Sequence, residues 1–242
     1  VRGAAMAAAA VKALPAKFKF QRLTPDLVKP ATECIATTFA VSSTGSSPDP
    51  FSWLFNLRKH HWRSMAGMFV ERAAHESISL VCLNDETGDV DGVMLNEDWK
   101  LHAPPAYRQL SSDWRPVRAA FNDLHTRFKS RGPHIMDGEV FHALIFTCTR
   151  PEAQGSGINR ELWRRSMETA QNHNFKEFVA EASTASTRRA LDALGFREVA
   201  SVPFADWLFE GQEVLSEAAE EKPDEWDRLS IHARKIHSDL WV

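Results

Sequence analysis

The sequence predicts a mixed α/β fold, and three observations support this prediction. Segments with strand-like and helix-like patterns alternate along most of the 242 residues. A polar stretch containing glycine separates two apolar segments, 77–83 and 90–95, which is typical of a β-hairpin. The near-continuous apolar run at 141–148 indicates a strand buried on both faces, and a glycine-rich loop follows it.

The first half of the chain is expected to hold a strand, three helices and the hairpin. Phe18, Phe20 and Leu23 alternate with polar residues, which predicts the first strand. Thr24-Pro25-Asp26 offers an N-cap followed by proline at the first helical position. Residues 41–50 are rich in Ser, Gly and Pro and are expected to form a loop. The expected elements are a strand at 18–23, helices at 27–39 and 51–75, strands at 77–83 and 90–95, and a helix at 117–128.

The second half predicts alternating strands and helices. The helix before Gly195 is expected to end at that glycine, because glycine readily adopts the left-handed conformation that follows many helices. An acidic stretch at 216–227 is interpreted as a surface linker. The expected elements are a strand at 141–148, a helix at 157–172, a strand at 177–182, a helix at 186–194 and strands at 198–204 and 229–236.

Composition narrows the class of protein. Hydrophobic residues make up 43% and charged residues 25% of the chain, which suffices for a substantial core. A net charge of -3 argues against nucleic-acid binding, and no apolar run approaches the roughly 20 residues that span a bilayer. Three cysteines without CxxC spacing indicate neither a disulfide framework nor a metal site. We therefore expect a cytoplasmic protein, monomeric or homodimeric. Residues 1–16 are interpreted as a disordered tail or a short transit peptide, and 17–242 as one domain.

The segment 147–163 carries the clearest functional signal. A buried strand leads through a Gln-Gly-Ser-Gly loop into a helix, and Gly155 and Gly157 allow the backbone to approach a ligand closely. N–H groups at such a helix start, together with the helix dipole, bind anions such as a pyrophosphate. The alternative is a tight turn without a ligand. The spacing fits neither a dinucleotide-binding GxGxxG motif nor a phosphate-binding GK[ST] loop.

These residues resemble a known family. Gln154-Gly155-Ser156-Gly157-Ile158-Asn159 is similar to the acetyl-CoA signature of GNAT N-acetyltransferases, with Asn159 in place of Gly or Ala, and 186–196, ending in Leu-Gly-Phe, is similar to the second signature. The resemblance implies a single-domain GNAT fold with a mixed, mostly antiparallel sheet of about seven strands, splayed at the fourth and fifth. An insertion at 99–137 near the acceptor site and the segment 202–207 most resemble the insect arylalkylamine N-acetyltransferases.

The resemblance also implies site residues. Asp49 is at the position of the general base and is one methylene shorter than the Glu of that group. Ser183 and Thr187 match two hydroxyls near the thioester. The alternatives are a loop turn for Asp49 and helix capping for both hydroxyls. Backbone N–H groups of 147–149 are expected to hold the oxyanion. The residues implied in binding acetyl-CoA, or another acyl-CoA, are Thr147, Cys148, Thr149, Gln154, Gly155, Ser156, Gly157, Ile158 and Asn159.

Further residues are candidates for chemical roles. The family's thiolate-protonating tyrosine has no counterpart, since the single tyrosine, Tyr107, lies in the insertion. His60-His61 as metal ligands and Cys148 as a nucleophile are minor alternatives to structural roles. Four tryptophans are expected either in an aromatic acceptor pocket or in the core: Trp53, Trp62, Trp99 and Trp114.

The expected function is acetyl transfer, without a metal, to a small primary amine of the arylalkylamine or polyamine type through a ternary complex. The alternatives are a protein or peptide N-acetyltransferase and a non-catalytic acyl-CoA-binding module.

Overall fold

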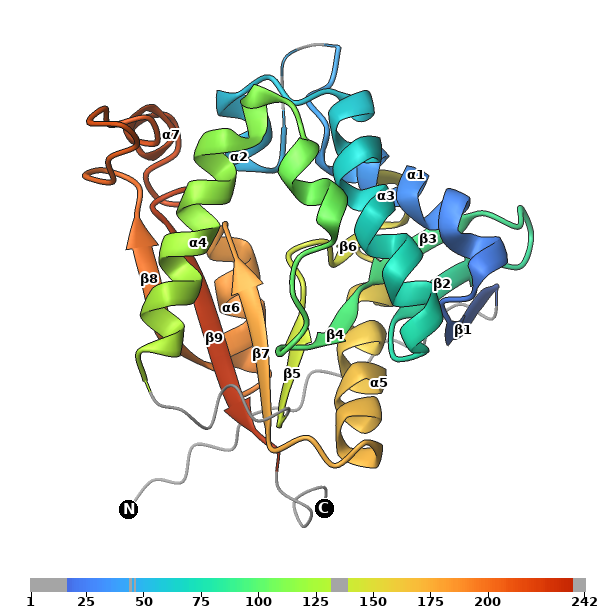
Figure 1. The fold of residues 1–242 in the computed structure, drawn as a ribbon. Coiled ribbons are helices and arrows are strands. Elements are labelled where there is room, and N and C mark those ends of the chain that lie inside the picture. The colour runs from blue at the N-terminus through green and yellow to red at the C-terminus, as the bar shows by residue number, and fades with distance from the viewer. Residues whose placement is uncertain (1–16, 44, 46, 132–138, 237–242) are drawn as a thin grey trace, which may run out of the picture.

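The computed structural model describes residues 17–43, 45, 47–131 and 139–236. Within these residues, nine strands form two sheets that are covered by helices (Figure 1). The mixed α/β fold class is thus confirmed. The expected tail at 1–16 lies outside the described residues.

The four-stranded sheet is antiparallel throughout. Its order is β1-β2-β3-β6, and β2 and β3 form the predicted hairpin, in which Leu80 pairs with Met94. The first strand forms as expected from its alternating phenylalanines. The strands are β1 (Phe18–Arg22), β2 (Leu80–Asn84), β3 (Val90–Met94) and β6 (Cys148–Thr149).

The five-stranded sheet has the order β4-β5-β7-β9-β8, and only the pair β5–β7 is parallel. The described residues form two strands more than predicted. The apolar run at 141–148 divides, because β5 pairs with β4 and β7 whereas β6 pairs with β3. The three-residue strand β4 is too short to show a periodicity. The strands are β4 (Asn96–Asp98), β5 (Val140–Ala143), β7 (Glu177–Ala182), β8 (Arg197–Pro203) and β9 (Arg228–Lys235).

The helices bury two hydrophobic clusters on opposite faces of the sheets. Helices α1, α3 and α4 contribute to one cluster, and α5 and α6 to the other. The helix predicted at 51–75 is two helices, separated at Asn56, where φ is 49°. The bounds are α1 (Val28–Phe39), α2 (Pro50–Leu54), α3 (Lys59–Glu76), α4 (Arg115–Lys129), α5 (Ile158–Asn172), α6 (Ala185–Ala193) and α7 (Ser216–Glu221).

The interpretation of 216–227 as a surface linker is wrong. This segment begins with helix α7, and Leu215, Ala218 and Trp226 are buried in the core. Trp226 packs against Trp53, with 5.7 Å between ring centroids. The many acidic residues cover the outer side, and the sparse apolar residues anchor the segment. Across the described part of the chain, no helix is both long and apolar enough to cross a membrane.

Candidate active site

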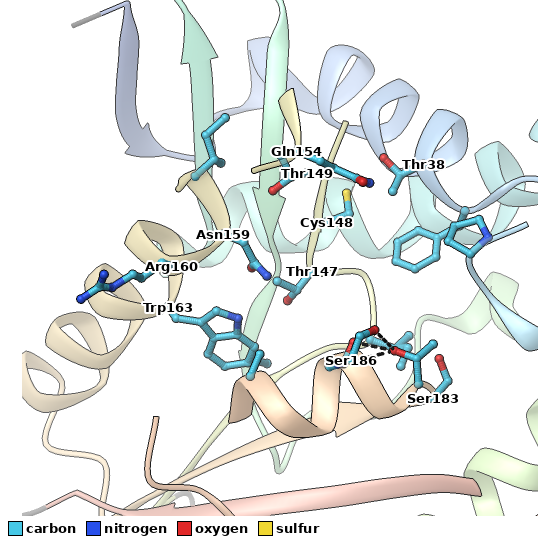
Figure 2. Close-up of a pocket in the computed structure, with 18 of the residues that line it drawn as sticks. Thr38, Thr147, Cys148, Thr149, Gln154, Asn159, Arg160, Trp163, Ser183 and Ser186 are labelled. Carbon is cyan, nitrogen blue, oxygen red and sulfur yellow. Dashed lines mark hydrogen bonds between the residues drawn. The ribbon is translucent and has the colours of Figure 1, made fainter. Parts of the chain in front are cut away.

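The two sheets separate where β5 ends and β6 begins, and a cavity of about 850 Å³ lies at this gap. It is lined by the loop before α2, by β6, by the start of α5, by the end of β7 and by α6 (Figure 2). Eleven of the twelve residues expected at the site line this cavity, although they come from distant parts of the chain. The twelfth, Ser156, faces a neighbouring hollow. The eleven are Asp49, Thr147, Cys148, Thr149, Gln154, Gly155, Gly157, Ile158, Asn159, Ser183 and Thr187.

The glycine loop has the backbone geometry expected of an anion site. Gly155 and Gly157 have φ angles of 75° and 95°, in the left-handed region that favours glycine. Gly157 is the N-cap of α5, and the first turn of that helix has N–H groups without intrahelical partners. The loop is therefore a tight turn, as the alternative proposed, and also directs a helix N-terminus at the cavity.

Two further features fit this end of the cavity to a polar ligand. The Thr149 hydroxyl is buried, lines the cavity and has no hydrogen-bond partner among the described residues. Helix α5 packs so closely on β3 that a Cβ at Gly92 would lie 2.5 Å from Cγ2 of Ile158. Gly92 thus permits the close packing that sets the position of the loop. The expected oxyanion donors are the backbone N–H groups of 147–149, which line the same cavity. The Thr147 N–H, however, already donates to the Leu144 carbonyl at 3.3 Å.

Asp49 is 2% exposed and occupies the N-cap of α2. Its Oδ2 accepts a hydrogen bond from the Ser52 N–H at 2.8 Å, and the Trp62 indole N–H donates to the Ser52 hydroxyl at 2.8 Å. Burial raises the pKa of Asp49 to about 6, although hydrogen bonds from Ser52 and Ser183 act in the opposite direction. Asp49 is therefore a structural cap whose carboxylate is also poised to accept a proton near neutral pH.

The hydroxyl side chains that follow β7 have two roles: some cap helix α6 and others face the cavity. Ser183 is buried and donates to Oδ1 of Asp49 at 3.4 Å, so it is not a cap. The N-cap of α6 is Thr184, which sequence reasoning missed although it directly precedes the helix. Its hydroxyl accepts the Thr187 N–H at 3.3 Å and lies 2.9 Å from the Thr187 hydroxyl. Thr187 thus supports the cap and also lines the cavity. Figure 2 shows Ser183 and Ser186 across the cavity from Asn159 and Trp163 of α5.

No family model and no curated protein matches this chain, but solved structures match over nearly its whole length. The C-terminal condensation domain of Ebony, in complex with β-alanyl-dopamine, aligns with 93% of this chain and 100% of its own at a TM-score of 0.72 and 12% identity. Arylalkylamine N-acetyltransferase 2 from Aedes aegypti aligns with 91% and 99% at a TM-score of 0.66 and 17% identity. The polyamine N-acetyltransferase of Drosophila melanogaster aligns with 90% and 99% at a TM-score of 0.62 and 11% identity.

The chain has the GNAT fold. The expectation from its two glycine-containing signatures is thus confirmed at the level of the fold. The division of 141–148 into β5 and β6 is the splayed strand that the resemblance implied.

The GNAT fold of this chain holds a second cavity, of about 220 Å³, on the other side of the same gap. It shares Leu144, Ile145 and Glu181 with the first cavity. Nine of its lining residues come from the 99–137 segment, which was expected near the acceptor site: Trp99, Leu101, His102, Ala103, Tyr107, Phe121, Asn122, His125 and Lys129.

A buried network of charged groups lies between the two cavities, and sequence reasoning missed it. The Glu181 carboxylate accepts the Ile145 N–H at 3.0 Å and contacts Nε2 of His125 at 2.5 Å and Nε2 of His142 at 3.4 Å. Nδ1 of His142 lies 3.1 Å from Glu97, which also pairs with Arg72. Its members are far apart in sequence, and no spacing pattern connects them.

This network fixes the charge of two buried groups. Burial acts to lower the pKa of His142, but the carboxylates of Glu181 and Glu97 raise it to about 9. Burial acts to raise the pKa of Glu181, but the imidazoles of His142 and His125 hold it well below its ordinary value. At neutral pH the gap therefore holds a buried imidazolium beside a buried carboxylate.

The remaining candidates have mainly structural surroundings. Trp53, Trp62 and Trp114 pack in the core, and only Trp99 of the four lines the second cavity. Burial raises the pKa of Cys148 far above its ordinary value, which argues against a thiolate nucleophile. Nδ1 of His61 accepts the Arg58 N–H at 2.9 Å, as part of a capping box. Within the described ranges, no group of three or more His, Cys, Asp or Glu side chains is placed to hold a metal.

Proposed function

We propose that this chain is an acetyl-CoA-dependent N-acetyltransferase acting on a small primary amine by direct transfer in a ternary complex. The observation that carries the proposal is Asp49: a buried carboxylate with a raised pKa, in one cavity with a glycine loop at a helix start. The glycine loop and α5 would bind the diphosphate of the thioester donor, and Thr149 offers a free hydroxyl to it.

In this mechanism the acceptor amine is held beside the thioester carbonyl. The amine is bound as an ammonium group, so Asp49 first takes a proton from it directly or through water, and the neutral nitrogen then attacks the carbonyl carbon. The negative charge on the carbonyl oxygen would be held by backbone N–H groups near β6. The C–S bond then breaks, the nitrogen loses its second proton as the amide forms, and the leaving coenzyme A thiolate takes up that proton through solvent. Ser183 would keep the Asp49 carboxylate oriented, and Thr187 would contact the reacting groups from α6.

The test measures thiol release from acetyl-CoA with tyramine, tryptamine, serotonin, dopamine and spermidine. We expect turnover with at least one amine, and a loss of about 10²–10⁴-fold in kcat for Asp49→Asn with unchanged acetyl-CoA affinity. Calorimetry with acetyl-CoA supplies the binding control. Acetylation of peptides but not of free amines would favour a peptide N-acetyltransferase. Binding of acetyl-CoA without any turnover would refute the enzyme and favour a binding module.

A further inference from the structure

We propose that the second cavity admits the acceptor and that Glu181 is the residue that positions its ammonium group at the gap between the sheets. We further infer that this cavity selects amines with one positive charge and a flat ring over polyamines. This inference rests on the proposed function and extends it to the substrate class.

The two cavities meet at the gap. Leu144, Ile145 and Glu181 line both of them, and Leu144 and Ile145 belong to the segment that leaves β5 before β6 begins. An amine in the second cavity therefore reaches the first cavity at the point where the strands separate. A donor bound along the glycine loop occupies the opposite side, so both reactants approach one point without competing for space.

Glu181 is the anionic group at this meeting point. Its side chain is 2% exposed, which makes its interactions stronger than those of a surface carboxylate. A carboxylate offers about four positions for hydrogen-bond donors. The Ile145 N–H and His125 occupy two of them, and Nε2 of His142 lies 3.4 Å away as an ion-pair partner without a hydrogen bond. Room remains for a donor of the ligand, and an ammonium group suits this place in charge and size.

Five aromatic side chains line the second cavity. The rings come from α3, α4, the 99–137 segment and the chain between β5 and β6. Such walls bind a flat ring by stacking and edge contacts, and they attract a cation over the ring faces. A volume of about 220 Å³ leaves room for one small aromatic amine. The aromatic residues are Phe69, Trp99, Tyr107, Phe121 and Phe146.

The other charged groups of the cavity oppose a second cation. Lys129 lines it, and His142 carries a positive charge at neutral pH. Glu97, the other carboxylate of the lining, is paired with Arg72 and with His142. His102, His125 and Tyr107 complete the titratable groups of the described lining. None adds negative charge, because a histidine is neutral or cationic and burial raises the pKa of the Tyr107 hydroxyl. A second ammonium in this cavity would therefore meet a cation rather than a free carboxylate.

The experiment compares kcat/KM for tyramine with kcat/KM for agmatine and spermidine. We expect the wild type to prefer tyramine by at least about tenfold, a difference of about 1.4 kcal/mol. Lys129→Glu should reduce this preference by about tenfold, because it replaces the cation with an anion. Lys29→Glu makes the same charge change at an exposed position of α1 outside both cavities, and it should leave the preference unchanged.

Glu181→Gln gives the second readout. We expect a rise in KM for tyramine of about tenfold or more with an unchanged affinity for acetyl-CoA, whereas general unfolding would weaken both. Lys129 is exposed, so its variant decides the question if the Glu181 variant does not fold. A polyamine preference in the wild type, or an unchanged preference in Lys129→Glu, would overturn the inference while the proposed function stands.

If no amine is acetylated, the proposed function fails and the inference is judged by binding. Calorimetry then measures tyramine and agmatine on the coenzyme A-saturated protein. Binding of tyramine that weakens about tenfold in Glu181→Gln would support the acceptor cavity, and equal binding to both proteins would refute it.

Discussion

Replacing Asp49 by Asn should make the protein more stable and inactive at the same time. The pKa of Asp49 is about 6 in the folded protein, against 3.8 for an unperturbed side chain. One pKa unit corresponds to about 1.4 kcal/mol, so the ionised carboxylate disfavours the folded state by about 3 kcal/mol above pH 6. Asn removes this cost and remains a good N-cap for the Ser52 N–H. The free energy of unfolding should therefore rise by about 3 kcal/mol at pH 8, or about 6–12 °C in Tm.

The pH dependence gives the stricter test of this reasoning. Below pH 3.8 Asp49 is protonated in both the folded and the unfolded state, so the variant gains nothing there. The increase in the free energy of unfolding of Asp49→Asn over the wild type should grow as the pH rises from 3.8 to about 6 and stay constant above that value. Urea unfolding at several pH values measures it. Asp49→Ala is the matched control, because it also removes the charge but loses the cap, worth about 1 kcal/mol. An Asn variant no more stable than the wild type at pH 8 would refute the reasoning.

Three further outcomes follow from the same geometry. The rate constant kcat/KM should rise with pH through about 6, because Asp49 must be deprotonated to accept a proton; a profile flat between pH 5 and 7 would contradict this. Ser183→Ala removes a hydrogen-bond donor that lowers the pKa of Asp49. The pH at which kcat/KM rises should therefore increase by up to about one unit. Gly92→Ala should destabilise the protein by about 1–3 kcal/mol and weaken acetyl-CoA binding, since its Cβ displaces Ile158 at the start of α5. Gly67→Ala, whose Cβ meets only Thr32 at 3.7 Å, is the control and should cost nothing.

Much of the secondary structure was predictable because it is local. Alternating and helical apolar patterns located six strands and most helices to within a few residues, and the seventh predicted strand divides into β5 and β6. The glycine loop was predictable too, since φ angles of 75° and 95° at Gly155 and Gly157 are properties of the residue type as well as of the fold. The helix α2 was missed as a separate element, although Asp49-Pro50 carries the same N-cap and proline signal that marked Thr24-Pro25.

The acidic segment at 216–227 shows where composition misleads. Its charge suggests solvent on all sides, yet Ala218 and Trp226 are buried in the core and Ala219 packs against it. A few apolar residues decide such a case, and a sequence does not reveal whether a matching surface exists elsewhere.

The sequence by itself determined most of the succession of strands and helices, the glycine turn and the candidate residues that line one cavity. The tertiary structure decided how the apolar run at 141–148 divides between two sheets, because strand pairing depends on partners far along the chain. It also decided the pKa of Asp49, which follows from burial rather than from neighbours in sequence. The network of Glu97, His142 and Glu181 exists only where three distant segments meet, and charges interact through space according to distance and burial.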